Sequence, residues 1–193
     1  MAKPLIFDIE TQNSFRDVNN DVRKLKVSVV AAYDFATEQA RAFTESQLPE
    51  LFKLFEKASV IIGYNSNSFD LAVLNEYYVG DVYRLPHFDL LEDIKEKLGK
   101  RLPLDDLVQA TLNQGKTGHG LHAIELYKQG KMDELIAYCK DDVRLTRDLF
   151  MHGVERGYIY YPDIPKKKVL PVENWKDQFT MQRVQGHNLT LGF

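Results

Sequence analysis

In the first third of the chain, hydrophobic residues occur in short runs separated by polar and turn-forming segments. Most of these runs are rich in β-branched and aromatic residues, which favour β-strands. They are Leu5–Phe7, which leads directly into Asp8, then Val27–Tyr33, Gln39–Phe43 and Ser59–Gly63. Residues 34–38 predict a turn between the second and third runs, and the polar residues 12–24 predict a loop.

Beyond residue 47, most apolar positions recur at the spacing of amphipathic helices. The helices expected from this spacing cover residues 47–57, 70–78, 90–98, 104–112, 121–128 and, as the longest, 131 to about 154. His87–Asp89 predicts a short extended piece, Asn113–Gly120 a glycine-rich loop, and Tyr158–Tyr161 a last edge strand. This order of elements predicts an α/β protein in which helices pack on the faces of a mixed sheet.

The chain length of 193 residues fits one domain with a small appendage. Gly157 precedes the last expected strand, so we assign residues 1–161 to a core domain and residues 162–193 to a basic C-terminal tail of unknown role. Residues 163–193 carry five basic and three acidic residues, which is a local charge of +2. The whole chain has 25 basic and 28 acidic residues, a net charge of −3, so the remaining residues sum to −5.

Composition narrows the class of protein further. A hydrophobic content of 44% and a charged content of 27% are those of a globular protein. The single cysteine, Cys139, excludes an intramolecular disulfide and a cysteine-cluster metal site. The apolar runs are far shorter than the ~20 residues of a membrane span, and no apolar signal segment precedes Asp8. We therefore expect a cytoplasmic protein without a membrane partner.

The negative net charge excludes a protein that binds nucleic acid through overall positive charge. It does not exclude binding of phosphate through metal ions, for which acidic residues are the ligands. Acids do stand at the ends of apolar elements, where burial is costly without a counter-ion. Asp8 and Glu10 follow the first apolar run, and residues two apart on a strand project from the same face. A divalent cation between them would relieve their repulsion, whereas two solvated acids at a strand end are the alternative.

Two further segments place acids in this way. Asp70 follows the small polar residues 64–68 and starts an expected helix, so it is either a ligand or a helix N-cap. Tyr138 and Asp142 lie one turn apart on the longest expected helix and share a face, whereas Asp141 faces elsewhere. A solvated helical face is the alternative for this pair, although an apolar stripe lies close to the same face.

Taken together, these motifs resemble the DEDD superfamily of 3′–5′ exonucleases, the proofreading-type branch of the ribonuclease-H-like fold. Phe7–Thr11 matches the first motif, Asn65–Asp70 the second, and Tyr138-x-x-x-Asp142 the third in its tyrosine form, DEDDy. The histidine form needs a histidine five residues before the last aspartate, and that position is Ala137. The resemblance covers about residues 4–160 and implies a ribonuclease-H-like mixed β-sheet flanked by α-helices.

The resemblance implies two bound divalent cations, Mg²⁺ or Mn²⁺, held by four carboxylates: Asp8, Glu10, Asp70 and Asp142. Carboxylate oxygens suit these hard cations, and a pair of cations can flank a scissile phosphate. Tyr138 would orient the attacking water, because a phenol with an ordinary pKa near 10 is a poor base at pH 7. The Thr11 backbone is expected to contact the terminal nucleotide, and Asn65 to bind the substrate strand or to steady its loop.

Several basic residues are candidates for contacts with a phosphate backbone. Lys140 and Arg144 flank the third motif, and Lys116 lies in the glycine-rich loop. The densest basic cluster of the core domain is equally explained as the solvated face of a helix, and it consists of Lys95, Lys97, Lys100 and Arg101.

Other reactive residue types have structural explanations. His119 and His122 lack a third partner at ligand spacing, so we expect loop and surface residues rather than metal ligands. Cys139 has no histidine near it in sequence and is expected to be a buried helix residue rather than a nucleophile. The aromatic residues that could stack on bases are more often core residues at such spacing, and they are Tyr64, Phe69, Tyr77 and Tyr78.

The predicted reaction is hydrolysis of the phosphodiester at a 3′ end, which releases nucleoside monophosphates, with single-stranded DNA favoured as substrate. An RNA-trimming enzyme is the alternative, because no residue indicates contact with a 2′-hydroxyl. A nucleic-acid-binding or scaffold module without catalysis is a third hypothesis, against which the complete set of carboxylates argues. DNA repair is the expected setting, with a polymerase, helicase or repair complex as a partner. The C-terminal tail either docks on such a partner or folds back as an extra strand.

Overall fold

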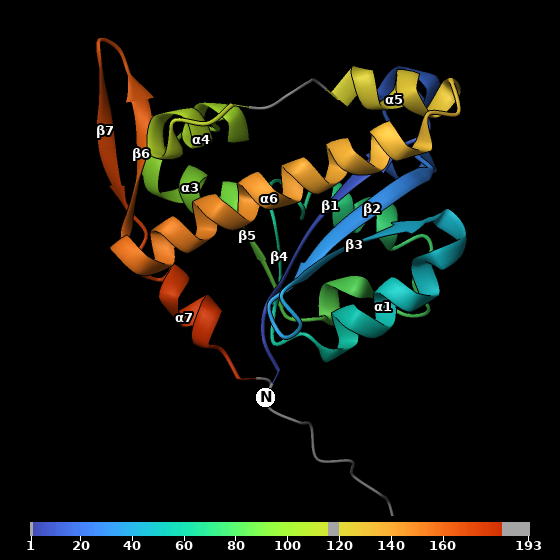
Figure 1. Ribbon diagram of the computed structural model, residues 1–193, viewed down its shortest axis with the longest axis horizontal. Helices are drawn as coiled ribbons and strands as arrows, with labels where there is room; N and C mark the ends of the chain where they lie inside the picture. Colours follow the sequence, from blue (N-terminus) through green and yellow to red (C-terminus); the bar gives the residue numbers. More distant parts are fainter. Residues whose placement is uncertain (1, 116–119, 183–193) are drawn as a thin grey trace, which may run out of the picture.

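A five-stranded mixed sheet forms the centre of the molecule (Figure 1). This computed structural model describes residues 2–115 and 120–182. The strands lie in the order β3-β2-β1-β4-β5, with β2 antiparallel to its neighbours and β1, β4 and β5 parallel to one another. Their bounds are β1 Leu5–Thr11, β2 Val27–Asp34, β3 Gln39–Thr44, β4 Ile61–Gly63 and β5 His87–Asp89. The predicted α/β class with a mixed sheet is confirmed.

The two faces of the sheet carry separate hydrophobic cores. On β1, Ile6 belongs to the core beneath the long helix α6 (Met132–Arg156), whereas Phe7 belongs to the core beneath α1 (Leu48–Lys57). Alternate residues of β2 divide in the same way, because successive side chains of a strand point to opposite faces. Figure 1 shows α6 crossing one face diagonally while α1 covers the other. The side chains of β1 that follow Ile6 on its face therefore point toward α6.

The remaining elements are short helices and 3-10 turns around this sheet. The α-helices are α2 Asp70–Leu74, α3 Leu90–Leu98, α4 Leu104–Leu112, α5 Gly120–Lys128 and α7 Trp175–Thr180. The 3-10 turns are η1 Phe15–Val18, η2 Val22–Lys24, η3 Glu45–Gln47 and η4 Val82–Arg84. The predicted loop over residues 12–24 therefore contains two turns, because Val18 is buried and draws the segment against the core.

Helix α2 is shorter than the sequence predicts. It ends at Leu74, whereas apolar spacing predicts a helix to residue 78. The chain leaves the helix there because Asn75 Oδ1 accepts a hydrogen bond from the Val82 backbone, which closes a local loop. Tyr77 and Tyr78 pack against the α1-side core from this loop rather than from a helix.

The first part of the C-terminal tail folds back onto the core. The strand predicted at residues 158–161 is β6 (Tyr158–Asp163), which pairs with β7 (Lys166–Pro171) in a separate antiparallel hairpin. After the hairpin, Trp175 is fully buried against Phe150 of α6, and its indole N–H donates to Asp93 Oδ2 at 2.8 Å. The domain boundary at residue 161 stays a prediction. No helix within residues 2–115 and 120–182 has the length and hydrophobicity needed to cross a membrane.

Candidate active site

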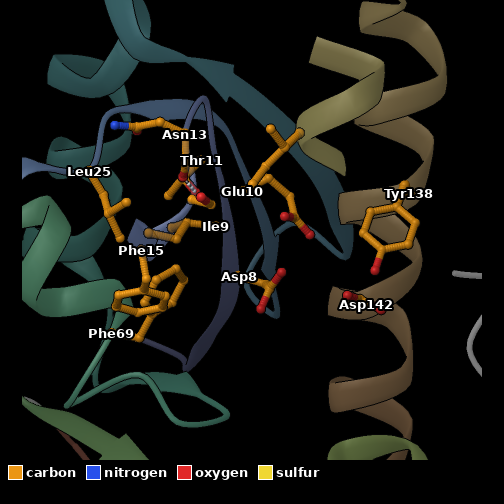
Figure 2. A pocket seen from close by; sticks show the side chains of 12 residues that line it. Asp8, Ile9, Glu10, Thr11, Asn13, Phe15, Leu25, Phe69, Tyr138 and Asp142 are labelled. Carbon is orange, nitrogen blue, oxygen red and sulfur yellow. Dashed lines mark hydrogen bonds between the residues drawn. The ribbon is translucent and has the colours of Figure 1, made fainter. Parts of the chain in front are cut away.

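Strand β1 and helix α6 bring three carboxylates together. Asp8 and Glu10 lie two residues apart on β1 and point toward α6, as Figure 2 shows. Asp142 projects from α6 toward them, and ligand oxygens of the three side chains all lie within 4.8 Å of one another. Glu10 and Asp142 are buried, with exposed fractions of 9% and 5%. Three carboxylates this close repel one another in the absence of a cation.

Tyr138 completes this group from one turn earlier on α6. Its side chain is buried and points into the space between β1 and α6 (Figure 2). Burial raises the pKa of the Tyr138 phenol, and the negative charges of Asp142, Glu10 and Asp8 raise it further. The phenol is therefore protonated at neutral pH, so it acts as a hydrogen-bond donor and not as a base.

Asp70 contacts β1 at the edge of the strand that pairs with β4. It starts α2, is 2% exposed, and its Oδ1 accepts a hydrogen bond of 3.2 Å from the Ile9 N–H. Strand β4 pairs with β1 only up to Ile6, so the Asp70 carboxylate satisfies a β1 donor beyond the end of β4. Asp70 thus contacts β1 at Ile9, the residue between Asp8 and Glu10. The cluster within 4.8 Å consists of Asp8, Glu10 and Asp142.

The loop before Asp70 is held by a residue that the sequence reasoning did not single out. Asp89, at the end of β5, is 4% exposed. Its Oδ1 accepts from the Asn65 N–H at 2.9 Å, and its Oδ2 accepts from the Asn67 N–H at 3.0 Å. Burial raises the pKa of Asp89, while these backbone hydrogen bonds oppose the rise. An aspartate just before a helix is a recognisable N-cap, and Asp89 does cap α3 through Leu91 N–H, but its contact with the loop is tertiary.

Asn65 lies within this loop in a left-handed conformation, with φ of 66°. Its side-chain oxygen accepts from Ser68 Oγ at 2.8 Å and from the Arg101 guanidinium. Asn65 therefore steadies the loop, which is one of the two roles expected from the sequence. Its part in substrate binding stays a prediction.

A cavity of about 310 Å³ opens beside the acids (Figure 2). One wall is polar and contains the three clustered carboxylates and Tyr138. The opposite wall is apolar, and there the rings of Phe15 and Phe69 lie 5.6 Å apart. Thr11 lines the cavity as well, and its hydroxyl donates to the Asn13 carbonyl at 2.9 Å, drawn dashed in Figure 2. A cavity of this size with one acidic and one apolar wall can hold a ligand that has a charged part and a flat hydrophobic part.

The basic residues predicted to contact a phosphate backbone are Arg144, Lys140 and Lys116. Arg144 is held by Asp141 at 2.8 Å, by Gln114 at 2.7 Å and by Asp148 at 3.3 Å. Neither Arg144 nor Lys140 lines the cavity. Lys116 and His119 lie outside the described residues. Arg144 therefore already has three protein partners, and its contact with a bound strand stays a prediction.

Two residues next to Tyr138 match their sequence-based expectations. His122 is exposed, and its ring lies edge-on to the Tyr138 ring with a centroid distance of 6.2 Å. Cys139 is fully buried and donates to the Asp8 carbonyl oxygen at 3.5 Å. Burial raises the pKa of the Cys139 thiol well above its usual range, and the nearby Asp8 charge adds to the rise. Cys139 is therefore no nucleophile at neutral pH.

A β-bulge lies next to Glu10. The register of β1 and β2 shifts at this point: Glu10 pairs with Val29, but Thr11 pairs with Val27, so Ser28 is an extra residue on β2. Bulges bend a strand locally and turn side chains to new directions, and they are common beside active sites. The bulged strand is β2, and its extra residue lies opposite the Glu10–Thr11 step of β1, so we expect the bulge to influence the direction in which Glu10 leaves β1.

Three side chains hold the bulge, and we call Gln12, Glu45 and Tyr77 the bulge network. Gln12 Nε2 donates to the Val27 carbonyl at 2.8 Å, and the Tyr77 hydroxyl accepts from the Val27 N–H at 3.2 Å. Glu45 accepts from both side chains, at 2.9 Å in each case. Burial raises the pKa of Tyr77 to about 12, so its hydroxyl keeps its proton for Glu45. The sequence gives no local signal of this network, because its members lie in separate loops and turns.

The donor set of the cluster fits a divalent metal. Carboxylate oxygens are the ligands that Mg²⁺ and Mn²⁺ prefer, and Asp8, Glu10 and Asp142 converge without any lysine or arginine among the described residues that line the cavity. A cation bound among these three acids would also remove their mutual repulsion.

Comparison with known proteins bears on the fold and the family. Residues 5–153 match the model of the RNase_H superfamily, while no curated protein matches the chain in sequence. The family B DNA polymerase of the hyperthermophilic archaeon Pyrobaculum calidifontis is similar over 81% of this chain and 26% of its own, with 21% identity and a TM-score of 0.59. RNase D of Trypanosoma brucei is similar over 92% of this chain and 74% of its own, with 12% identity and a TM-score of 0.56.

At these identities the two structures show the fold, and this chain spans only about a quarter of the polymerase's length. They confirm the ribonuclease-H-like arrangement expected from the sequence. Together with the family match, they also confirm the resemblance that rests on the three acidic motifs.

Removal of one clustered charge should stabilise the metal-free protein. In Asp142→Asn we expect the free energy of unfolding in EDTA to rise by on the order of 1 kcal/mol, because one of three crowded carboxylates becomes neutral. Mg²⁺ or Mn²⁺ should raise the unfolding temperature of the wild type by binding its folded state, and this rise should be lost in the variant. Thermal unfolding followed by circular dichroism, with EDTA and with each cation, measures both effects.

Asp141→Asn is the matched control, because Asp141 adjoins Asp142 on α6 but pairs with Arg144 outside the cavity. It should keep the cation-dependent rise. If Asp142→Asn instead kept the full rise, the cluster would not be a metal site.

Loss of the bulge network should weaken metal binding without touching a ligand. In Tyr77→Phe we expect Mn²⁺ affinity to fall by about tenfold, the lower end of the effect of residues that orient metal ligands. Titration calorimetry with Mn²⁺ measures this affinity. Tyr78→Phe is the control, since the Tyr78 hydroxyl donates to Glu56 at 3.0 Å and takes no part in the network. Equal affinities in the two variants would show that the network does not position Glu10.

Proposed function

The chain belongs to the RNase_H superfamily, a superfamily of nucleases, and we propose that it is a metal-dependent 3′–5′ exonuclease. It would hydrolyse the phosphodiester at the 3′ end of single-stranded nucleic acid, DNA in preference to RNA, and release nucleoside monophosphates. The observation that carries this proposal is the convergence of Asp8, Glu10 and Asp142 within 4.8 Å, with Tyr138 one turn away and a cavity beside them.

The acids supply the ligands for the cofactor of this reaction. Asp8, Glu10 and Asp142 would hold divalent cations, and Asp70 would join them if a second cation binds beside β1. When bound, the cations would activate water and stabilise the charge of the leaving oxygen. The buried position of the cluster strengthens this electrostatic effect, because water screens charges less there.

Tyr138 has a separate role in the proposed reaction. Its raised pKa keeps the phenol protonated, so it would donate a hydrogen bond that orients the attacking water or a phosphate oxygen. The protein would thus supply orientation through Tyr138, while proton abstraction would fall to another group.

The apolar wall of the cavity supports a nucleotide as the ligand. Phe15 is 44% exposed and lies against Phe69, so an aromatic surface faces the carboxylates across the cavity. A nucleobase would pack on this surface while its phosphate lies at the acids. Thr11, at the end of β1, would contact the sugar of the terminal nucleotide through its backbone.

The cellular setting stays a prediction. A cytoplasmic location and a role in DNA repair, with a polymerase, helicase or repair complex as partner, are proposals that rest on the sequence. In the structure Trp175 is already buried in the core of this chain, so a partner bound through the tail would have to contact other residues.

The proposed activity is tested with a 5′-labelled, 3′-tailed oligonucleotide, as DNA and as RNA, in Mg²⁺, Mn²⁺ or EDTA. We expect a ladder that shortens from the 3′ end with either cation and no cleavage in EDTA. DNA should be cut faster than RNA, and Asp142→Asn should cut neither. A wild-type protein that binds the strands, gains stability from the cation and yet leaves every substrate intact would be a binding module instead.

Replacement of Tyr138 separates orientation from metal binding. Tyr138→Phe should lower the cleavage rate by about 10- to 100-fold, since a positioned hydrogen bond to the reacting groups is lost. Its Mn²⁺ affinity should equal that of the wild type, because no ligand changes. Cleavage rates and calorimetric Mn²⁺ titration on one preparation provide the two numbers. A collapse of Mn²⁺ affinity would mean that Tyr138 is structural.

A further inference from the structure

Two basic segments that are distant in the sequence meet at the β6–β7 hairpin. Lys100, between α3 and α4, lies with its ammonium 5.6 Å above the ring of Tyr161 on β6. Lys168 on β7 pairs with Tyr161 across the hairpin, and Lys167 lies 4.1 Å above the ring of Tyr160. We call the resulting surface the basic hairpin patch, and its members are Lys100, Arg101, Lys166, Lys167 and Lys168.

The patch is fully solvent-facing, and its tyrosines orient its lysines. All five basic side chains belong to exposed residues. An ammonium group that lies over an aromatic ring is held in a restricted direction. The Lys167 ammonium also donates to the Ala110 carbonyl at 2.9 Å, so the ammonium groups of Lys100 and Lys167 are directed before any ligand binds.

Charge sets this surface apart from the rest of the chain. The neighbouring acids are Asp163, which pairs with Lys168 at 2.6 Å, and Asp105 and Asp106, which line a hollow together with Lys166 and Lys167. Five basic and three acidic residues give the surface a charge of +2, whereas the whole chain carries −3, so the rest sums to −5. Exposed ion pairs such as Lys168–Asp163 are weak, so Lys168 can exchange this partner for a phosphate.

Arg101 connects the patch to the candidate active site. Its guanidinium donates to Asn65 Oδ1, on the loop that joins β4 to Asp70. From there the basic residues continue through Lys100 to the hairpin, which reaches beyond α4 at one end of the molecule in Figure 1. The positive charges thus lead away from the Asp70 loop in one direction.

We propose that the basic hairpin patch binds the phosphate backbone of a single nucleic-acid strand whose 3′ end occupies the cavity. The inference rests on the proposed function and adds a second binding surface to it. The metal site would hold the terminal phosphodiester, and the patch would hold nucleotides farther toward the 5′ end. Long strands would therefore bind more tightly than short ones, and their affinity would depend more steeply on salt.

The test compares binding of 5′-labelled DNA of three and of twelve nucleotides. The protein is otherwise wild type with Mg²⁺ present, the strands carry phosphorothioate linkages at the 3′ end so that they stay intact, and binding is followed by fluorescence anisotropy over a range of salt concentrations. The test variant is Lys100→Gln/Lys166→Gln/Lys168→Gln. The control variant is Lys3→Gln/Lys53→Gln/Lys57→Gln, which removes the same charge from exposed residues just before β1 and on α1.

We expect the test variant to bind the twelve-nucleotide strand about 10- to 100-fold more weakly near 0.1 M salt, with a log–log salt slope shallower by about 2, since each contact contributes about 0.7 for a single strand. The Kd of the trinucleotide should stay unchanged in both variants. The control variant should keep the Kd and the slope of its parent for both strands.

Two results would contradict the proposal that the basic hairpin patch binds the phosphate backbone. One is an unchanged Kd of the test variant for the long strand; the other is an equal loss in the control variant. Lysines that serve only to keep the free edge of β7 from pairing with other chains would show as aggregation of the test variant, with no length-dependent change in Kd.

The same design separates this inference from the proposed function. A length-dependent loss of affinity in the test variant, when the wild-type protein cuts neither unmodified DNA nor RNA, would support strand binding at the patch and reject the nuclease. A wild-type protein that cuts DNA, combined with a test variant of unchanged affinity, would support the nuclease and reject strand binding at the patch.

Discussion

The repulsion among Asp8, Glu10 and Asp142 is the constraint around which the rest of this structure is arranged. Oxygens of these side chains lie within 4.8 Å of one another, and two of the residues are almost fully buried. Such a cluster opposes the packing of α6 on β1, although that packing also buries the core beneath α6. The fold tolerates the repulsion because the apolar residues on either side of the cluster fasten the helix to the sheet.

Long-range hydrogen bonds hold the segments around Asp70 and Glu10. Asp70 binds the N–H of Ile9, Asp89 holds the loop that leads to Asp70, and the bulge network holds the bend beside Glu10. Each of these contacts joins segments far apart in the chain. These contacts restrict the segments that carry the acids, which limits the reorganisation that cation binding requires.

Local patterns in the sequence predicted the elements and the three acidic motifs, because strand alternation and helical spacing act over a few residues. The same patterns failed at α2, where apolar residues up to Tyr78 suggest a longer helix but pack from a loop. They also gave no sign of Glu45 or Tyr77, whose partners are set by the sheet register. Two partners of Arg144, Asp141 and Asp148, lie three and four residues away on α6 and follow from helical spacing, whereas its contact with Gln114 beyond α4 does not.

Trp175 gives the structure a dependence on the order of synthesis. Gly153 leaves a notch on α6 in which a Cβ atom would lie 2.3 Å from the indole ring of Trp175 and 2.9 Å from a methyl group of Val172, so these two residues fill the notch. Because α6 emerges from the ribosome before Trp175, the outer side of the helix is covered only after the segment that contains Trp175 has been synthesised. Until then the notch and the neighbouring Phe150 stay open to solvent. A nascent chain that stalls before Trp175 is made would expose this hydrophobic surface to chaperones or to aggregation with other nascent chains.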